Sequence, residues 1–134
     1  MPETATAARA GPRPRGLTIV GWLFIAVGGI GLLVDWLPLL TARAAEHLSD
    51  LMVEGVPGLA LIWSVRLLAV VGGVGLLRGA RWARPLLAVW MLFHIGVSLL
   101  HSAAQFVVHV IVFAAVAYVI VRPSSSDYFR SHHD

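Results

Sequence analysis

A line of polar side chains that could bind a ligand or carry a proton runs through an otherwise apolar part of the chain. It consists of Trp90, His94, Ser98, His101, Gln105 and His109. Spacings of three or four residues place such side chains on one face of a helix. The surrounding segment, 86–121, contains no Asp, Glu, Lys or Arg. Because ionisable groups are rare in membrane-spanning segments and by default mark a site, we interpret this polar stripe as a candidate functional site.

Histidine is the residue type that decides which chemistry the stripe could support. Two neutral imidazoles on facing helices can bind haem iron, with His94 and His109 as the pair and His101 as a substitute. All three could instead form most of a tetrahedral zinc site. A quinone or a small anionic head group could meet Arg66 and a histidine donor. In the alternative interpretation each histidine hydrogen-bonds to a neighbouring helix and only specifies packing, so the cofactor and any metal stay open.

Two further charged residues lie in apolar segments. Arg66 lies roughly 12 Å beyond Gly58 at the helical rise of about 1.5 Å per residue, and Asp35 lies near the end of the preceding apolar segment. We expect these two to pair, since pairing lowers the cost of placing a charge in hydrocarbon. Otherwise Arg66 extends its long side chain to the interface. The predicted polar pocket comprises Asp35, Arg66, His94, Ser98, His101, Gln105 and His109.

The composition requires a bilayer around most of the chain. Of 134 residues, 58% are hydrophobic and 13% are charged, with a mean hydropathy of +0.82. Too few polar residues remain to cover a water-soluble core. The lack of cysteine excludes disulfides, iron–sulfur clusters and thiol catalysis. All basic residues are arginines, mostly in short loops, which favours membrane orientation over nucleic-acid binding.

Apolar segments predict four membrane helices. The expected spans are about 17–38, 57–77, 85–101 and 105–121. The last two form one uncharged segment that would rise roughly 54 Å as a single helix, too long for one span, so the chain must fold back between His101 and Gln105. The predicted fold is an all-α membrane protein, with a tail at 1–16, a four-transmembrane-helix bundle at 17–121 and a tail at 122–134. The composition of both tails is typical of segments that are disordered when isolated.

The placement of arginine predicts the orientation. Eight of the ten arginines lie before the first span, between the second and third, or after the fourth. The positive-inside rule places these segments, and both termini, in the cytoplasm of a bacterial inner membrane. Residues 41–55 have the pattern of a short amphipathic helix on the outer surface, either a lid over the polar pocket or a solvated connector. Ala42-Arg43-Ala44 resembles a signal-peptide cleavage site, but the preceding apolar run exceeds the usual length of about 7–15 residues, so we expect an uncleaved first helix.

A glycine-rich pattern occurs twice, because residues 27–33 recur almost unchanged at 71–77. Small residues let helices approach closely in lipid. A nucleotide-binding glycine loop would need a preceding strand, and none is predicted here. The two copies therefore predict close helix packing. They lie on antiparallel spans and do not establish a duplicated transporter fold.

One group of residues resembles a known kind of protein. It comprises 76–84, then Trp90, His94, Ser98 and His101-Ser102, then Arg122-Pro123 and Tyr128-Phe129. In these residues the chain resembles small uncharacterised bacterial membrane proteins of four helices, and at fold level it is similar to DoxX-like proteins. The resemblance implies a four-helix bundle and no known activity, so it identifies no catalytic residue. Trp82 and Tyr128 also have the character of interfacial aromatic residues beside arginine anchors.

Three function classes are compatible with these features. We expect a membrane protein without catalytic machinery that acts as an accessory or assembly subunit of an inner-membrane complex, because no nucleophile–base pair, paired carboxylates or nucleotide motif is present. Its partners would be the bilayer and other membrane subunits or further copies of itself. The first alternative is a haem- or quinone-binding redox subunit using His94, His101 and His109. The second is a small oligomeric transporter or proton relay through Asp35, Arg66 and the polar stripe.

Overall fold

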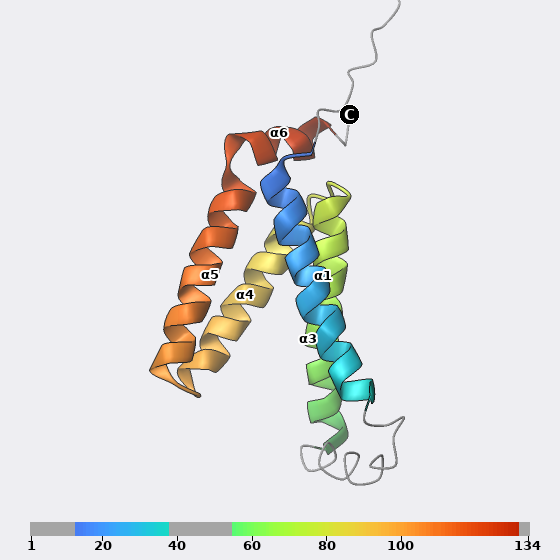
Figure 1. Ribbon diagram of the computed structural model, residues 1–134, viewed down its shortest axis with the longest axis vertical. Helices are drawn as coiled ribbons and strands as arrows, with labels where there is room; N and C mark the ends of the chain where they lie inside the picture. Colours follow the sequence, from blue (N-terminus) through green and yellow to red (C-terminus); the bar gives the residue numbers. More distant parts are fainter. Residues whose placement is uncertain (1–12, 38–54, 132–134) are drawn as a thin grey trace, which may run out of the picture.

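The computed structural model describes residues 13–37 and 55–131, and every regular element in these ranges is a helix (Figure 1). The helices are α1 (Arg15–Trp36), α3 (Gly55–Leu77), α4 (Ala83–Leu99), α5 (Ala103–Val121) and α6 (Pro123–Ser131). The first four match the four predicted spans to within a few residues. The predicted amphipathic helix at 41–55 falls almost wholly outside the described residues, and Gly55 begins α3.

Among the described residues, three helices are long and apolar enough to cross a membrane. These are Arg15–Trp36, Ala60–Leu77 and Ala103–Val121, while α4 is apolar but shorter. Most large hydrophobic side chains of α1 and α5 are exposed rather than packed inside the protein, for example Leu33 and Ile111. Such a surface is the one that acyl chains cover in a bilayer. The helix content, the length of the apolar helices and their exposed apolar surface therefore support the predicted helical membrane bundle.

The fold-back occurs where the length argument predicts it. Helix α4 ends at Leu99 and α5 begins at Ala103. Ser102 has an extended backbone (φ −164°, ψ 152°), and its hydroxyl accepts a hydrogen bond from the Gln105 N–H at 3.2 Å. A serine in this position is an N-cap, since its oxygen satisfies one of the free N–H groups of the first turn. The turn thus needs neither glycine nor proline.

Close contact between α1 and α3 depends on glycines from both copies of the repeated pattern. A Cβ added to Gly28 would lie 2.5 Å from the carbonyl oxygen of Arg66, and one added to Gly73 would lie 2.6 Å from that of Gly21. Both distances are far below van der Waals contact, so a side chain here would push the helices apart. By contrast, a Cβ on Gly29 would meet nothing within 4 Å. The predicted packing role of the repeat is confirmed for these two glycines.

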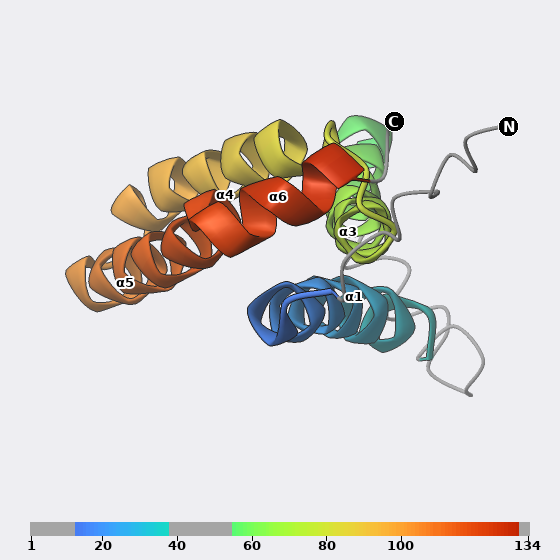
Figure 2. The same ribbon diagram turned by 90° about the horizontal axis from the view of Figure 1, so that it is seen from above.

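Residues 123–131 differ from the disordered tail that their composition predicts. They form α6, which lies across the end of the bundle where α1 begins and α5 ends (Figures 1 and 2). The Tyr128 hydroxyl donates to the carbonyl of Leu77 at 3.1 Å, and the Ser125 hydroxyl donates to that of Val119 at 2.7 Å. Phe129 is 1% exposed. Two buried aromatic side chains, Tyr128 and Phe129, therefore hold this segment in place. The average composition of the segment is polar, so a prediction from composition overlooks these two residues.

The helices form two antiparallel hairpins, α1 with α3 and α4 with α5. At the end that carries α6 the hairpins lie close together, and towards the opposite end they diverge (Figure 1). Arg81 donates to the carbonyl of Phe129 at 3.3 Å, and Arg84 donates to that of Ile120 at 3.1 Å. The α3–α4 turn is thus tied to α6 and to the end of α5. We call this end of the bundle the arginine end.

Replacing Gly28 by alanine should lower the stability of the bundle by about 1–3 kcal/mol, the usual cost of overpacking. The added Cβ would strike a backbone oxygen that cannot move alone. Gly29→Ala is the matched control, one residue along the same helix, and we expect it to leave the melting temperature unchanged or slightly raised. Thermal unfolding in detergent, followed by circular dichroism, measures both. Equal melting temperatures for the two variants would contradict the assigned contact.

Candidate functional site

A cleft of about 640 Å³ separates the two hairpins in the described part of the chain. Aliphatic side chains of α1 and α3 line one side, among them Val27, Leu61 and Val65. Its polar groups come from Arg66, His94, His101 and His109. The cleft therefore has mostly apolar walls with a few polar groups, the usual character of a small-molecule site.

Arg66 and Asp35 form the ion pair that the sequence predicts. The Arg66 guanidinium binds the Asp35 carboxylate and also donates to the backbone carbonyl of Gly31. The side chains are 29% and 12% exposed, respectively. A Cβ on Gly31 would lie 3.0 Å from the Arg66 side chain, so this glycine makes room for the guanidinium. The repeated glycine pattern at 27–33 predicts only helix packing for Gly31, because spacing along one helix cannot show what the facing helix places there.

Trp90 positions His94 against the α1–α3 hairpin. Its indole N–H donates to the carbonyl of Val65 at 2.6 Å, which docks α4 onto α3. The His94 ring stacks on the indole with ring centroids 3.7 Å apart and planes at 27°. Phe24 of α1 packs edge-on against the same indole, with centroids 5.4 Å apart. One residue of the stripe therefore acts as a platform for the next.

His109 of α5 faces His94 of the neighbouring helix α4, and both belong to the α4–α5 side of the cleft. Their ring centroids are 6.2 Å apart and their planes are nearly parallel, at 14°. The structure therefore brings together the two histidines that the sequence places on separate helices as a candidate pair. His101 lies at the rim of the cleft and is largely exposed.

All three histidines share one hydrogen-bonding arrangement. Each Nδ1 contacts the carbonyl four residues earlier, at 3.0 Å for His94, 3.0 Å for His101 and 2.8 Å for His109. A carbonyl can only accept, so Nδ1 carries the proton. In the neutral imidazole this leaves Nε2 with a free lone pair. The histidines therefore present hydrogen-bond acceptors, or ligands for a metal.

Three members of the predicted pocket, Asp35, Ser98 and Gln105, do not line the cleft. Ser98 is fully buried, and its hydroxyl donates to the carbonyl of Ile95 at 2.7 Å within its own helix. Gln105 is exposed at the start of α5. The stripe is not continuous because the chain reverses at residues 100–102, so α5 presents its face in a new direction. Asp35 is connected to the cleft only through Arg66.

The zinc hypothesis has no geometric support in the described ranges. No group of three or more His, Cys, Asp or Glu side chains there is arranged to hold a metal ion. His101 is thus not brought into one ligand set with the facing pair His94 and His109. A two-histidine ligand set, as haem would use, remains a prediction.

Replacing Arg66 by methionine should lower the free energy of unfolding, because it leaves the Asp35 carboxylate buried without its partner. Breaking a buried pair usually costs about 3–5 kcal/mol, and we expect a loss near the lower value. The partial exposure of the guanidinium sets the expectation at that lower end. The double variant Arg66→Met, Asp35→Leu should recover much of the loss, since it removes the stranded charge as well. Thermal unfolding in detergent compares the three proteins. A double variant as unstable as Arg66→Met would show that the pair is not the source of the effect.

Comparisons with models of known protein families, with curated proteins and with solved structures found no match. The resemblance to DoxX-like four-helix proteins therefore remains a prediction from the residues that carry it. The function of this chain is therefore inferred from the residues that line its own cleft. That cleft combines a neutralised ion pair, two parallel imidazoles and apolar walls.

Proposed function

We propose that this chain is a non-enzymatic membrane subunit that holds a lipid-soluble molecule of the quinol class in the cleft between its hairpins. The facing pair His94 and His109 is the observation that carries the proposal. The volume of about 640 Å³ supports it, because small-molecule sites usually measure about 300–1,000 Å³. The ligand would be a flat ring bearing hydroxyl groups, attached to an apolar tail.

The direction of the hydrogen bonds favours a quinol over its oxidised quinone. Both facing imidazoles use Nδ1 as a donor to the backbone, so their Nε2 atoms accept when the rings are neutral. A quinol hydroxyl donates and matches this arrangement, whereas a quinone carbonyl only accepts. The flat ring of the ligand would also stack favourably beside imidazole and indole rings.

Arg66 argues against an anionic head group in this cleft. Its charge is already balanced by Asp35, and one of its N–H groups is directed to Gly31. Transport or proton relay through the same pair is also less supported, since each of the two charges is held by the other. The neutral pair instead provides a polar but uncharged end to an apolar cavity.

Access to the cleft from the bilayer fits a membrane-dissolved ligand. Residues of both hairpins line the cleft, and the hairpins diverge away from the arginine end (Figure 1), so we propose that a ligand enters from the bilayer between them. We propose that the chain then acts as an accessory subunit of a larger complex in the bacterial inner membrane. Its described residues form membrane-type helices and one short end helix, with no separate extramembrane domain.

Both ends of the described chain should lie in the cytoplasm, with 41–55 outside. The protein has no cysteine, so single cysteines can be introduced without background. A membrane-impermeant maleimide applied to intact cells should label Ser49→Cys, and it should label Ser124→Cys only after lysis. The reverse pattern would overturn the orientation that arginine placement predicts.

Reduced decylbenzoquinone should raise the melting temperature of the purified protein in detergent, because a ligand that binds only the folded state stabilises it. His109→Leu should weaken this binding about five- to tenfold, the effect expected for one lost hydrogen bond. Gln105→Leu is the matched control, because it removes a polar side chain one turn earlier on α5, outside the cleft. The oxidised form should bind more weakly than the reduced form.

Two results would contradict the quinol proposal. One is the absence of any stabilisation beyond that seen for an unrelated membrane protein in the same detergent. The other is equal binding by wild type and His109→Leu. An absorption spectrum provides an independent test, since a Soret band in the purified protein would show bound haem, with His94 and His109 as the candidate axial ligands.

A further inference from the structure

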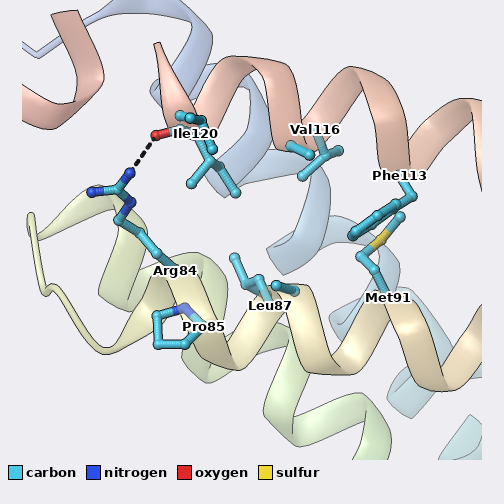
Figure 3. Close-up of a pocket in the computed structure, with 10 residues that line it drawn as sticks. Arg84, Pro85, Leu87, Met91, Phe113, Val116 and Ile120 are labelled. Carbon is cyan, nitrogen blue, oxygen red and sulfur yellow. Dashed lines mark hydrogen bonds between the residues drawn. The ribbon is translucent and has the colours of Figure 1, made fainter. Parts of the chain in front are cut away.

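A second cavity lies between α4 and α5 near the arginine end, away from the cleft. It measures about 260 Å³ and has apolar walls that include Leu87, Met91, Phe113 and Val116. Figure 3 shows Arg84 at one end of this cavity and the pair Met91 and Phe113 at the other. The cavity is therefore a short apolar channel along two helices that ends at a positive charge.

Arg84 is held in place by contacts with uncharged groups of the described residues. One Nη donates to the Ile120 carbonyl at the end of α5, and the guanidinium lies 5.1 Å from the centroid of the Phe129 ring (Figure 3 shows the hydrogen bond). In the described part of the chain the ion pair found is Asp35–Arg66, and no described carboxylate pairs with Arg84. A guanidinium has five N–H donors, so several stay available to an anion.

An open groove runs along another side of α5. It has a volume of about 580 Å³ and is lined by Ala114, Ala117, Tyr118, Val121 and Arg122. The Arg122 guanidinium lies 5.5 Å from the centroid of the Tyr118 ring. Ala117 and Val121 line both this groove and the first cavity. Two apolar grooves thus flank one ridge of α5, and each ends at an arginine at the same end of the helix.

We propose that these paired grooves bind one anionic diacyl phospholipid, with an acyl chain in each groove and the phosphate between Arg84 and Arg122. Two parallel apolar grooves match two chains, and two arginines at one end match a single negative head group. Arginines at this position lie where lipid head groups begin, and each basic residue near an anionic surface contributes favourably. This site is separate from the quinol cleft and does not depend on it.

Native mass spectrometry of the full-length protein tests the site with phosphatidylglycerol and phosphatidylcholine as probes. Wild type should bind phosphatidylglycerol in preference to phosphatidylcholine. Arg84→Gln and Arg122→Gln should each weaken phosphatidylglycerol binding about fivefold and leave phosphatidylcholine binding unchanged. Arg15→Gln is the matched control, because it removes an exposed charge at the same end outside both grooves. Ala117→Phe should weaken binding of both lipids by filling the shared wall while retaining every charge.

Several outcomes would overturn the proposal. Equal affinity for the two lipids would show that the arginines do not select the head group. An equal loss in Arg15→Gln would assign the effect to overall charge rather than to this site. Displacement of the lipid by inorganic phosphate would show that the grooves contribute nothing to binding. Self-association that Ala117→Phe abolishes, with unchanged lipid binding, would assign the grooves to a second copy of the chain. Because Arg84 also donates a hydrogen bond to Ile120, a melting curve of Arg84→Gln shows whether that variant is still folded. Arg122 is exposed, so Arg122→Gln tests the lipid site without removing such a bond.

Discussion

The contact of α1 with α3 at residues 65–66 is the constraint on which the rest of the structure depends. The Arg66 carbonyl lies so close to Gly28 that no side chain fits between the two helices. At this separation the Arg66 side chain reaches Asp35 and the Gly31 carbonyl. The preceding carbonyl, that of Val65, accepts the indole N–H that docks α4. In hydrocarbon, polar groups must find partners within the protein. The close packing of α1 and α3 is therefore also what allows the charged side chain of Arg66 to reach its partners.

Aromatic rings connect this contact to the candidate site and fix the positions of its side chains. The indole that binds α3 carries the stacked ring of His94, and His109 of α5, in the same hairpin as His94, lies parallel to it. Backbone hydrogen bonds at Nδ1 fix how each imidazole is presented. The site is thus positioned mainly by rings and carbonyls on helices, which are stiffer supports than loops. What remains adjustable is the separation of the two hairpins.

That separation is limited by the Trp90–Val65 hydrogen bond and by further bonds at one end of the bundle. At the arginine end, Arg81 and Arg84 donate to carbonyls of α6 and α5, and Tyr128 of α6 donates to the end of α3. Cationic side chains near the carbonyl ends of helices also interact favourably with the helix dipole. These bonds close the bundle where arginines are plentiful. Towards the other end the two hairpins diverge (Figure 1), and residues of both line the cleft.

From the sequence alone one can predict an all-helical apolar protein, its four apolar helices, the fold-back near residue 102 and the pairing of Asp35 with Arg66. These features follow from hydropathy, helical rise and the cost of an isolated charge, which are local or pairwise quantities. Only the tertiary structure decided that His94 and His109 share the cleft while Ser98 and Gln105 do not line it. Periodicity assigns residues to one face of a helix, but it cannot say where that face points once the chain has reversed. For the same reason, only the fold revealed that Gly31 accommodates a guanidinium and that Phe129 is buried in α6.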